Sequence, residues 1–575
     1  MQRSCSRRQG SCHKRTDRRI EATRRVAIAV ILFLVGASCR TPDEDPLLAF
    51  PTEPQPGQFH GLSYPASTVE ELAAPTRPLW LIAVDGASWD LLDPLLESGQ
   101  LPHLASLIDR GARGTLVSEE PTISPALWAT IATGTPRFVH GILNFVEKRP
   151  GQWRGETAGP LHRMTPAIWE HVGAAGGRSS VIGWFGSYPA EPIAGIYLSR
   201  GFEPGRIEPL QVHPPALVGR FDEWAMDTTI PDTSEFIARS MREDARNVLA
   251  LRSLPEADSA DLVAVYLSVI DVAQHVEWRY MDPGSDVFPG SSTTQSDRAD
   301  RIATAYRFVD GLIGQLLERM PDEANLLLVS DHGAGPLRLQ EAFHLQLEIL
   351  LQDVGLMDAD APEEGDAWAL SAPYRHDKRI WVTRDDTRAD ELSDRLRSMT
   401  TDLGEPIFES IIDHSAQSGW TPDAPALTVR FSPQALVARQ VADGDTTHDF
   451  SPVRMRHEDV SGSHRLEGIV VAAGPDIVAG KIQRPLTLYN IAPTALYLLG
   501  LPQDRRMLRW APADGGVAEA LVLPRTLAGR PPVMVPTYPG TERSSDKVQE
   551  TWKILDDSPN REQDLERLRS LGYIR

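Results

Sequence analysis

Short apolar runs recur along the chain from residue 79 and alternate with stretches of helical periodicity. The first run is residues 79–84 (LWLIAV), and four more lie at 180–184, 262–270, 326–329 and 468–472. Runs of four to nine apolar residues separated by helices are typical of a mostly parallel sheet that is covered by helices on both faces. The pattern therefore predicts an α/β fold with a three-layer sandwich.

Mixed polar and apolar positions between these runs mark the helices. We expect helices at 88–97 and 102–110, the second ended by Gly111, and a third at 168–172 that ends at Gly173. Glycine often follows the last turn of a helix because it adopts backbone conformations that other residues avoid. No repeat of fixed period is present, which argues against solenoid and propeller architectures.

The alternation of strands and helices is interrupted between residues 341 and 455. This segment holds several prolines and more charge, with one expected helix at 387–400. We therefore expect a core formed by 79–340 and 456–515, into which 341–455 is inserted as a cap or lid domain. Residues 516–575 would form a C-terminal extension.

The N-terminal part differs from the rest of the chain. Residues 1–25 are basic, an apolar run follows at 26–38, and Cys39 comes directly after it. That run is shorter than the ~20 residues that span a bilayer, and a basic flank before a short apolar run is typical of an export signal. We expect residues 1–39 to direct export to the bacterial cell envelope or beyond, and 40–78 to form a flexible tether. If Cys39 carries a lipid, that lipid would anchor the protein and be its contact with a membrane. The alternative is a plain cleavage site near Cys39, without an anchor.

Composition narrows the possible partners and ligands. The chain has 575 residues with 58 Lys and Arg against 79 Asp and Glu, a net charge of -21. Phosphate backbones attract basic surfaces, so this acidity argues against binding of a nucleic-acid duplex. The three cysteines, Cys5, Cys12 and Cys39, all lie near the N-terminus. A metal ion in the remaining chain would therefore need Asp, Glu and His as ligands.

Three of the predicted strands end at an aspartate: Asp85, Asp271 and Asp331. Aspartate is disfavoured within strands, and open parallel sheets bind ligands just beyond the carboxyl ends of their strands. A single aspartate at such a position is commonly a turn residue. Three of them at one edge of a sheet indicate a site.

Histidines accompany these carboxylates. His275 follows Asp271 by one helical turn, so both side chains can face one metal ion. His332 follows Asp331 directly, and His464 lies just before the last apolar run. Any one of these histidines alone would be read as an ordinary surface or core residue. As a set, three Asp and three His are the ligand types that a zinc or manganese pair requires.

Candidate nucleophiles lie in residues 121–134 (PTISPALWATIATG). A hydroxyl in a turn before a helix meets positive potential and free N–H groups. Beside a metal ion such a hydroxyl loses its proton near neutral pH and becomes a strong nucleophile. Thr122 and Ser124 both qualify on this argument, and the alternative is that Ser124 and Pro125 merely start a helix.

These motifs together resemble the alkaline phosphatase superfamily and, within it, the type I phosphodiesterase/nucleotide pyrophosphatase branch. The resemblance rests on 83–86 (AVDG), 124–134, 140–142 (HGI), Asp271 with His275, 331–333 (DHG) and His464, all in the family's order. It covers most of 79–340 and 455–500. It implies an alkaline-phosphatase-like catalytic core that hydrolyses phosphate esters with two divalent metal ions, expected to be zinc.

The resemblance also implies a role for each site residue. One zinc would be held by Asp271, His275 and His464, and the other by Asp85, Asp331, His332 and the nucleophile oxygen. Counted back from Thr133 and Gly134, the family's register places the nucleophile at Ser124 rather than Thr122. Phosphodiesterases of the family usually have threonine there.

Two positions depart from the family's pattern. The branch often has asparagine three residues after the nucleophile, where this chain has Leu127. The next residue often donates a backbone N–H, which Pro125 lacks. Such donors are typically worth about 3 kcal/mol each in the transition state. The two zinc ions, or donors from the cap, would have to substitute for them.

The sequence thus predicts an exported two-metal hydrolase that acts on a small-molecule phosphate ester through a phospho-serine intermediate. The nearest basic residues in this stretch, Arg113 and Arg137, lie far from Ser124 along the chain, which favours a singly charged diester over a dianionic monoester. We expect the second ester group to lie against Leu127 and Trp128, unless Trp128 packs into the core.

Alternatives remain open on the sequence. They are a phosphomonoesterase, a phosphoglycerate-mutase-like transferase, and a catalytically idle binding protein on the same fold. A cation from the cap would favour the monoester, and the candidates for it are Arg375, Lys378 and Arg379.

Overall fold

The structure, a computed structural model, describes most of residues 72–541. Within that range it leaves out 149–151, 154, 204–205, 222–228, 255–258, 283–295, 339–342, 359, 362–364, 372–376, 384–387, 416–424, 457–459 and 512–514. The predicted export signal with Cys39, most of the predicted tether, and the chain beyond 541 lie outside the described residues.

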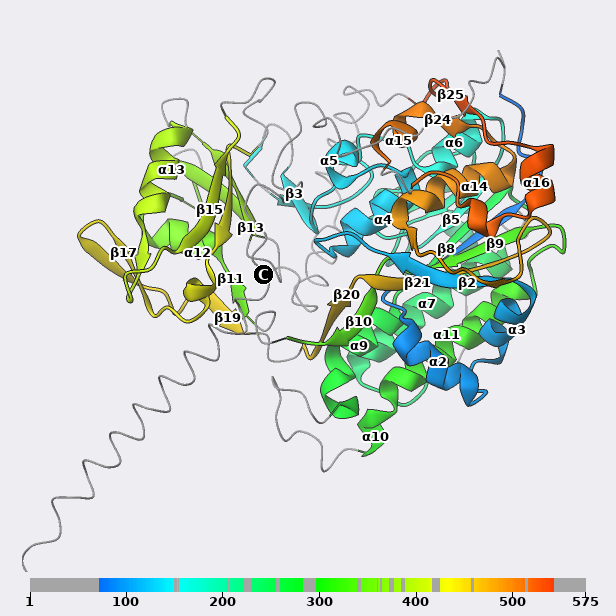
Figure 1. Cartoon of the computed structure of the whole chain (residues 1–575), viewed down its shortest axis with the longest axis horizontal. Coiled ribbons are helices and arrows are strands. Elements are labelled where there is room, and N and C mark those ends of the chain that lie inside the picture. The colour runs from blue at the N-terminus through cyan, green and yellow to red at the C-terminus, as the bar shows by residue number, and fades with distance from the viewer. Residues whose placement is uncertain are drawn as a thin grey trace, which may run out of the picture.

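A ten-stranded sheet forms the middle layer of the core (Figure 1). In order across the sheet its strands are β22 (Gly480–Lys481), β2 (Ala112–Val117), β21 (Glu467–Ala473), β9 (Asn325–Val329), β1 (Leu79–Val84), β8 (Leu262–Leu267), β5 (Ser179–Ile182), β6 (Gly195–Leu198) and β7 (Val212–His213), while β23 (Leu486–Thr487) pairs with β2. Strands β9, β1, β8, β5 and β6 are parallel neighbours, whereas β21 is antiparallel to β9 and to β2. The predicted mostly parallel sheet is confirmed.

The continuous apolar runs reflect burial of both faces of the sheet. All six residues of β1 are buried. Trp80 and Ile82 face one hydrophobic cluster, and Leu79 and Leu81 face the other. Side chains alternate between the two faces of a strand, so a strand covered on both sides needs apolar residues at every position.

Helices cover the two faces and complete the three layers (Figure 1). One face carries α2 (Trp89–Glu97), α3 (Pro102–Arg110), α7 (Glu235–Ser253), α9 (Val269–Met281) and α11 (Arg301–Leu317). The other face carries α4 (Ser124–Thr133), α6 (Ile168–Ala174), α14 (Ile491–Leu499) and α15 (Arg505–Trp510). Shorter helices are α5 (Arg137–His140), α10 (Ser296–Ala299) and α16 (Pro524–Gly529). No helix within the described residues is both long and apolar enough to cross a membrane.

One predicted strand end was wrong. The apolar run at 262–270 leaves the strand at Leu267, and α9 begins at Val269, so Asp271 lies in the first turn of a helix. The buried Asp244 carboxylate explains the change, because it accepts the backbone N–H groups of Ser268 and Val269 at 2.9 Å each. Such acceptors stabilise the start of a helix.

The inserted segment forms a separate lobe with its own hydrophobic cluster, which includes Leu350, Leu392 and Phe431 (Figure 1). Its antiparallel sheet runs in the order β12 (Ala367–Ser371), β13 (Asp377–Val382), β16 (Leu427–Phe431), β15 (Phe408–Asp413). The lobe also holds β14 (Thr400–Thr401), β17 (Gln440–Asp443) and β18 (Thr446–Asp449), with helices α12 (Leu347–Asp353) and α13 (Ala389–Ser398). We call this lobe the cap.

Two short strand pairs connect the cap to the core. They join β10 (Gly333–Pro336) to β20 (Gly462–Arg465) and β11 (Phe343–Leu345) to β19 (Arg454–Arg456), both antiparallel. The chain thus enters and leaves the cap along adjacent strands. The hairpin of β3 (Val146–Lys148) and β4 (Gly155–Thr157) reaches from the core toward the cap, where Trp153 lies 6.3 Å from Trp368 between ring centroids.

Residues after 515 continue along the core surface. The two-residue strand β25 (Met534–Val535) pairs with β24 (Gln503–Asp504). Leu521 and Tyr538 are fully buried in the hydrophobic cluster that contains α14. The described part of the C-terminal segment is therefore packed onto the core.

Candidate active site

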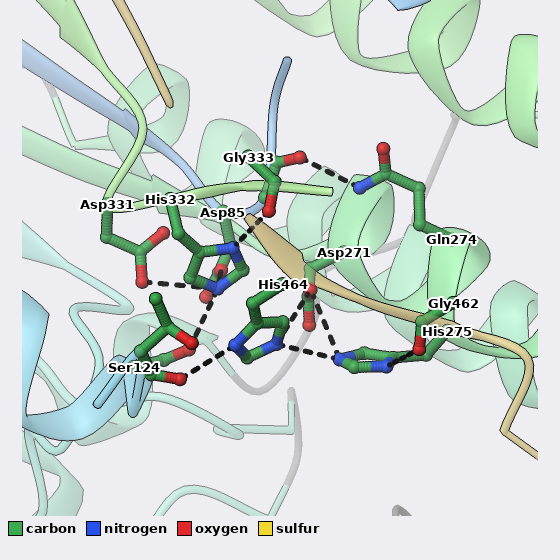
Figure 2. Close-up of polar contacts among 12 residues, drawn as sticks. Asp85, Ser124, Asp271, Gln274, His275, Asp331, His332, Gly333, Gly462 and His464 are labelled. Atoms are coloured by element: carbon green, nitrogen blue, oxygen red, sulfur yellow. Dashed lines mark hydrogen bonds and ion pairs between the residues drawn. The ribbon is translucent and has the colours of Figure 1, made fainter. Parts of the chain in front are cut away.

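The first group of candidate ligands lies at the carboxyl ends of two neighbouring parallel strands. Asp85 follows β1, and Asp331 with His332 follows β9. Asp85, Asp331 and His332 are all buried, and each offers a ligand atom within 4.8 Å of the others. His332 Nε2 lies 3.3 Å from Asp85 Oδ1 and 3.5 Å from Asp331 Oδ2 (Figure 2).

The second group combines a helix and a strand from distant parts of the chain. Asp271 and His275 lie one turn apart on α9, and His464 lies on β20. Their ligand atoms also lie within 4.8 Å of one another. Nε2 of His275 and Nε2 of His464 are only 2.9 Å apart, and each lies near Asp271 Oδ1, at 3.4 and 3.6 Å (Figure 2). Two imidazole nitrogens this close repel each other through their lone pairs unless a proton or a cation lies between them.

The strand pair at the base of the cap brings the two groups together. In β10–β20, Ala334 pairs with His464, which places His464 over His332. Their rings stack with centroids 3.7 Å apart and planes at 20°. Gly333 lets the chain pass close to the start of β21, because a Cβ there would lie 2.2 Å from the carbonyl oxygen of Glu467.

All three histidines are oriented by backbone carbonyls. The Nδ1–H groups of His275, His332 and His464 donate to the carbonyls of Gly462, Gly333 and Thr122, at 3.0, 2.9 and 2.7 Å. A carbonyl only accepts, so each Nδ1 carries a proton, and Nε2 is the nitrogen that each ring presents to the site. Such hydrogen bonds commonly fix the tautomer of a metal-binding histidine.

Ser124 joins the first group from the other side. It begins α4, and its Oγ lies 3.3 Å from His332 Nε2 (Figure 2). Thr122 takes part through its carbonyl, which accepts a hydrogen bond from His464. The structure thus brings together all seven residues that the sequence singled out as nucleophile and ligands: Asp85, Ser124, Asp271, His275, Asp331, His332 and His464.

The buried charge fits divalent cations. Both carboxylate oxygens of Asp331 and Oδ1 of Asp85 are buried without a hydrogen-bond partner among the described residues. Burial, and then the neighbouring Asp85 carboxylate, raise the pKa of Asp331 well above its usual range. Such a cluster is costly unless a cation neutralises it. Burial, together with His332 and His275, lowers the pKa of His464 well below its usual range, which keeps the imidazole in the form that binds metal.

The donor set is also right for zinc. Each group offers one or two carboxylate oxygens and one or two neutral imidazoles, and these are common zinc and manganese ligands. The residues present therefore fit one divalent ion at each group.

The predicted contact of Leu127 and Trp128 with substrate is wrong. Every residue of α4 is buried, because the helix lies between the sheet and the helices packed on it. Trp128 packs edge-on against Trp184 and Tyr266, with centroids 5.4 and 5.3 Å apart. Its Nε1–H donates to Asp85 Oδ2 at 3.1 Å. Trp128 thus supports a ligand from behind instead of facing the substrate.

Several supporting residues were not predicted from the sequence. The Tyr266 hydroxyl of β8 donates to Asp85 Oδ2. Gln274 of α9 donates to the Gly86 carbonyl at 2.8 Å and accepts from the Tyr306 hydroxyl at 3.2 Å. The polar tip of Tyr266, set in an otherwise apolar strand, was the available signal.

Basic residues near Ser124 in the sequence have carboxylate partners. Arg113 of β2 pairs with Asp93 of α2 at 2.6 Å. Arg137 lies 3.3 Å from Glu119 and also donates to the carbonyl of Pro121 at 2.8 Å. Arg137 therefore supports the loop that leads to Ser124 while its charge is compensated.

The cations suggested in the cap give a similar picture. Arg379 pairs with Glu147 of the core at 2.9 Å, and the other oxygen of Glu147 accepts the two N–H groups of 143–144. Lys378 is buried, and Arg375 lies outside the described residues. The Arg379–Glu147 ion pair thus joins the cap to a core loop.

An α/β sandwich with two carboxylate–histidine groups around a buried serine at the strand ends is the architecture of the alkaline phosphatase superfamily. The chain belongs to the type I phosphodiesterase/nucleotide pyrophosphatase family, whose model matches residues 79–456. The predicted family is confirmed, and with it membership of a family of phosphoester hydrolases.

Among solved structures, the chain is similar to phosphonoacetate hydrolase from Sinorhizobium meliloti 1021 in complex with phosphonoacetate, at 15% identity over 75% of this chain and 96% of the other, with a TM-score of 0.45. Murine ectonucleotide pyrophosphatase/phosphodiesterase 5, an inactive variant with AMP, is 14% identical over 78% and 100%, with a TM-score of 0.46. No curated protein matched the chain.

Proposed function

We propose that the protein is a two-metal phosphodiesterase that uses Ser124 as its nucleophile. The observation that carries the proposal is the position of Ser124 Oγ, 3.3 Å from His332 Nε2 and beside two groups of buried acidic and imidazole ligands. Family membership supports the same class of reaction.

Asp271, His275 and His464 would hold one zinc ion, and Asp85, Asp331 and His332 the other. Bound there, the two ions would supply Lewis acidity that lowers the pKa of the serine hydroxyl and stabilises the leaving oxygen. Ser124 attacks phosphorus in line and its Oγ–H proton passes to solvent water. The ester bond to the leaving group breaks, and the leaving oxygen takes up a proton from water and departs as an alcohol. The resulting phospho-serine is then hydrolysed by water, which restores the Ser124 hydroxyl.

The preference for a diester rests on charge. A monoester dianion needs more compensation than a singly charged diester. Arg113, Arg137 and Arg379 are each paired with a carboxylate, so their charges are already compensated. A substrate that brings one negative charge to the metal ions is the better match.

The reaction takes place outside the cytoplasm in this proposal. The basic and apolar residues 1–38 would direct export, and Cys39 would carry a lipid that anchors the protein to a bacterial envelope membrane. Replacement Cys39→Ala should move the protein from the membrane to the soluble fraction of the envelope. Equal membrane association of both forms would contradict the anchor.

One preparation assayed with two esters tests the main proposal. We expect kcat/KM for an aryl phosphodiester to exceed that for the matching aryl phosphomonoester. A monoester preference of about tenfold or more, equal to about 1.4 kcal/mol in barrier, would change the assignment from phosphodiesterase to phosphomonoesterase. A protein that binds two zinc ions but hydrolyses neither ester, nor others in a panel, would be a binding protein on this fold.

A further inference from the structure

We propose that Tyr266, together with Trp128, is a positioning residue that leaves Asp85 a single oxygen with which to bind metal. This inference rests on the proposed function and deepens it, because it concerns how one metal-binding group acquires its geometry.

The two carboxylate oxygens of Asp85 have different surroundings. Oδ2 accepts hydrogen bonds from the Tyr266 hydroxyl and from Trp128 Nε1, the latter at 3.1 Å. Oδ1 is buried, has no hydrogen-bond partner among the described residues, and lies 3.3 Å from His332 Nε2. Two donors on one oxygen leave the other as the free ligand atom.

Both donors are held rigidly by the core. Tyr266 lies on β8 opposite Ala83 of β1, two residues before Asp85. The Tyr266 and Trp128 rings pack edge-to-face, with centroids 5.3 Å apart and planes at 89°, and both side chains are buried. Trp184 packs on the other side of Trp128. The donors therefore cannot follow Asp85 if it rotates, and the hydrogen bonds fix its side chain.

Trp128 also connects this arrangement to the nucleophile. It follows Ser124 by four residues on α4, so the two side chains project from the same side of the helix. The bond from Trp128 to Asp85 thus sets the distance between the serine helix and the first ligand group.

Asp331 provides the contrast within the same group. The Tyr266 and Trp128 donors lie on Asp85, whereas the hydrogen-bond donor that lowers the pKa of Asp331 is the Gly86 backbone N–H. Tyr266 donates to Asp85 and not to Asp331, so removal of the Tyr266 donor should act on Asp85. Supporting hydrogen bonds to metal ligands are typically worth 10- to 100-fold in metal affinity.

Tyr266→Phe tests the inference, since it removes the hydroxyl and keeps the ring. Tyr197→Phe is the matched control, because Tyr197 lies buried on strand β6 of the same sheet and its hydroxyl donates to Glu191. Full-length protein stripped of metal is titrated with zinc against a chromophoric chelator, which needs no turnover. We expect Tyr266→Phe to weaken one of the two zinc sites by about 10-fold or more, and Tyr197→Phe to leave both unchanged.

Cobalt gives a second readout. With one of its two donors removed, Oδ2 of Asp85 should compete with Oδ1 for the metal, so the coordination number of Co²⁺ at that site should rise and its visible absorption should fall. Trp128→Phe removes the other donor and should act in the same direction if Tyr266→Phe does not fold. Wild-type zinc affinities and an unchanged cobalt spectrum in a folded variant would overturn the inference while the proposed function stands. A wild-type protein that binds no zinc would instead remove the proposed function, and the inference with it.

Discussion

Gly86→Ala should damage the site through a single methyl group. Gly86 follows Asp85 with φ +72°, and a Cβ there would lie 2.9 Å from Asp271 Cβ and 3.0 Å from both Asp271 Cα and Oδ1. The Gly86 carbonyl also accepts from Gln274 on the same helix as Asp271. The chain after β1 therefore passes close to the start of α9 at Gly86, where no side chain obstructs the contact.

Two costs follow from this geometry. A left-handed backbone costs a residue with a Cβ about 1–2 kcal/mol, and insertion of a methyl into a tightly packed place costs about 1–3 kcal/mol more. Gly99→Ala separates the two terms, because Gly99 has φ +71° but nothing within 4 Å of an added Cβ. We expect Gly99→Ala to lower the free energy of unfolding by about 1–2 kcal/mol and Gly86→Ala by about 2–5 kcal/mol.

Urea unfolding followed by circular dichroism measures these differences on metal-stripped protein, so that bound metal does not add to stability. Zinc titration of the same variants then reports the site. Gly86→Ala should lose affinity at the Asp271 group, because the methyl displaces that carboxylate, whereas Gly99→Ala should bind as the wild type does. Equal destabilisation by the two substitutions, with both zinc sites intact in Gly86→Ala, would refute the argument from close approach.

Four further predictions concern the nucleophile, the metal and the fold. Ser124→Ala should abolish hydrolysis and retain most metal binding, while Thr122→Ala, which leaves the backbone carbonyl in place, should retain turnover; the opposite result would move the nucleophile. Strong chelators should remove activity and zinc restore it. Zinc affinity should fall as pH falls. Burial raises the pKa of Asp331, so protons compete with the metal at a higher pH than they would at an exposed aspartate. An affinity that is level from about pH 8 to about pH 5 would contradict this. Although burial opposes it, hydrogen bonds from His171 and Arg506 lower the pKa of Asp504 to about 2 from 3.8. Asp504 therefore stabilises the fold by about 2 kcal/mol above about pH 4, and the stability is lost as pH falls toward 2. Asp504→Asn should be less stable by that amount at neutral pH, and urea curves of the two proteins should converge near pH 2.

The fold was largely predictable from the apolar runs. Residues 79–84 and 326–329 correspond closely to β1 and β9, because strands buried on both faces need apolar residues at every position. The same signal misplaced the end of β8. The run at 262–270 stays apolar through the change from strand to helix, and the determinant of that change, the Asp244 carboxylate, lies on α7.

The candidate ligands could be predicted from the sequence, whereas the residues that support them could not. Asp, His and Ser stood out because such residues are unusual next to apolar strands. Trp128 and Tyr266 have the composition of core residues, and they are core residues, each with one polar atom directed at Asp85. The direction of that polar atom depends on how β1, β8 and α4 pack together. The spacing of residues along the chain does not predict it.

The pairing of Gly333–Pro336 with Gly462–Arg465 implies that the cap can change in sequence and length without a change in the core. These strands hold the two ends of the insertion side by side, whatever the intervening chain contains. The entropy of closing such a loop changes only slowly with its length. We therefore expect insertions or deletions between residues 337 and 461 to leave the stacking of His332 on His464 in place. In the proposed enzyme, specificity would then diversify in the cap while the metal-binding groups of the core stay unchanged.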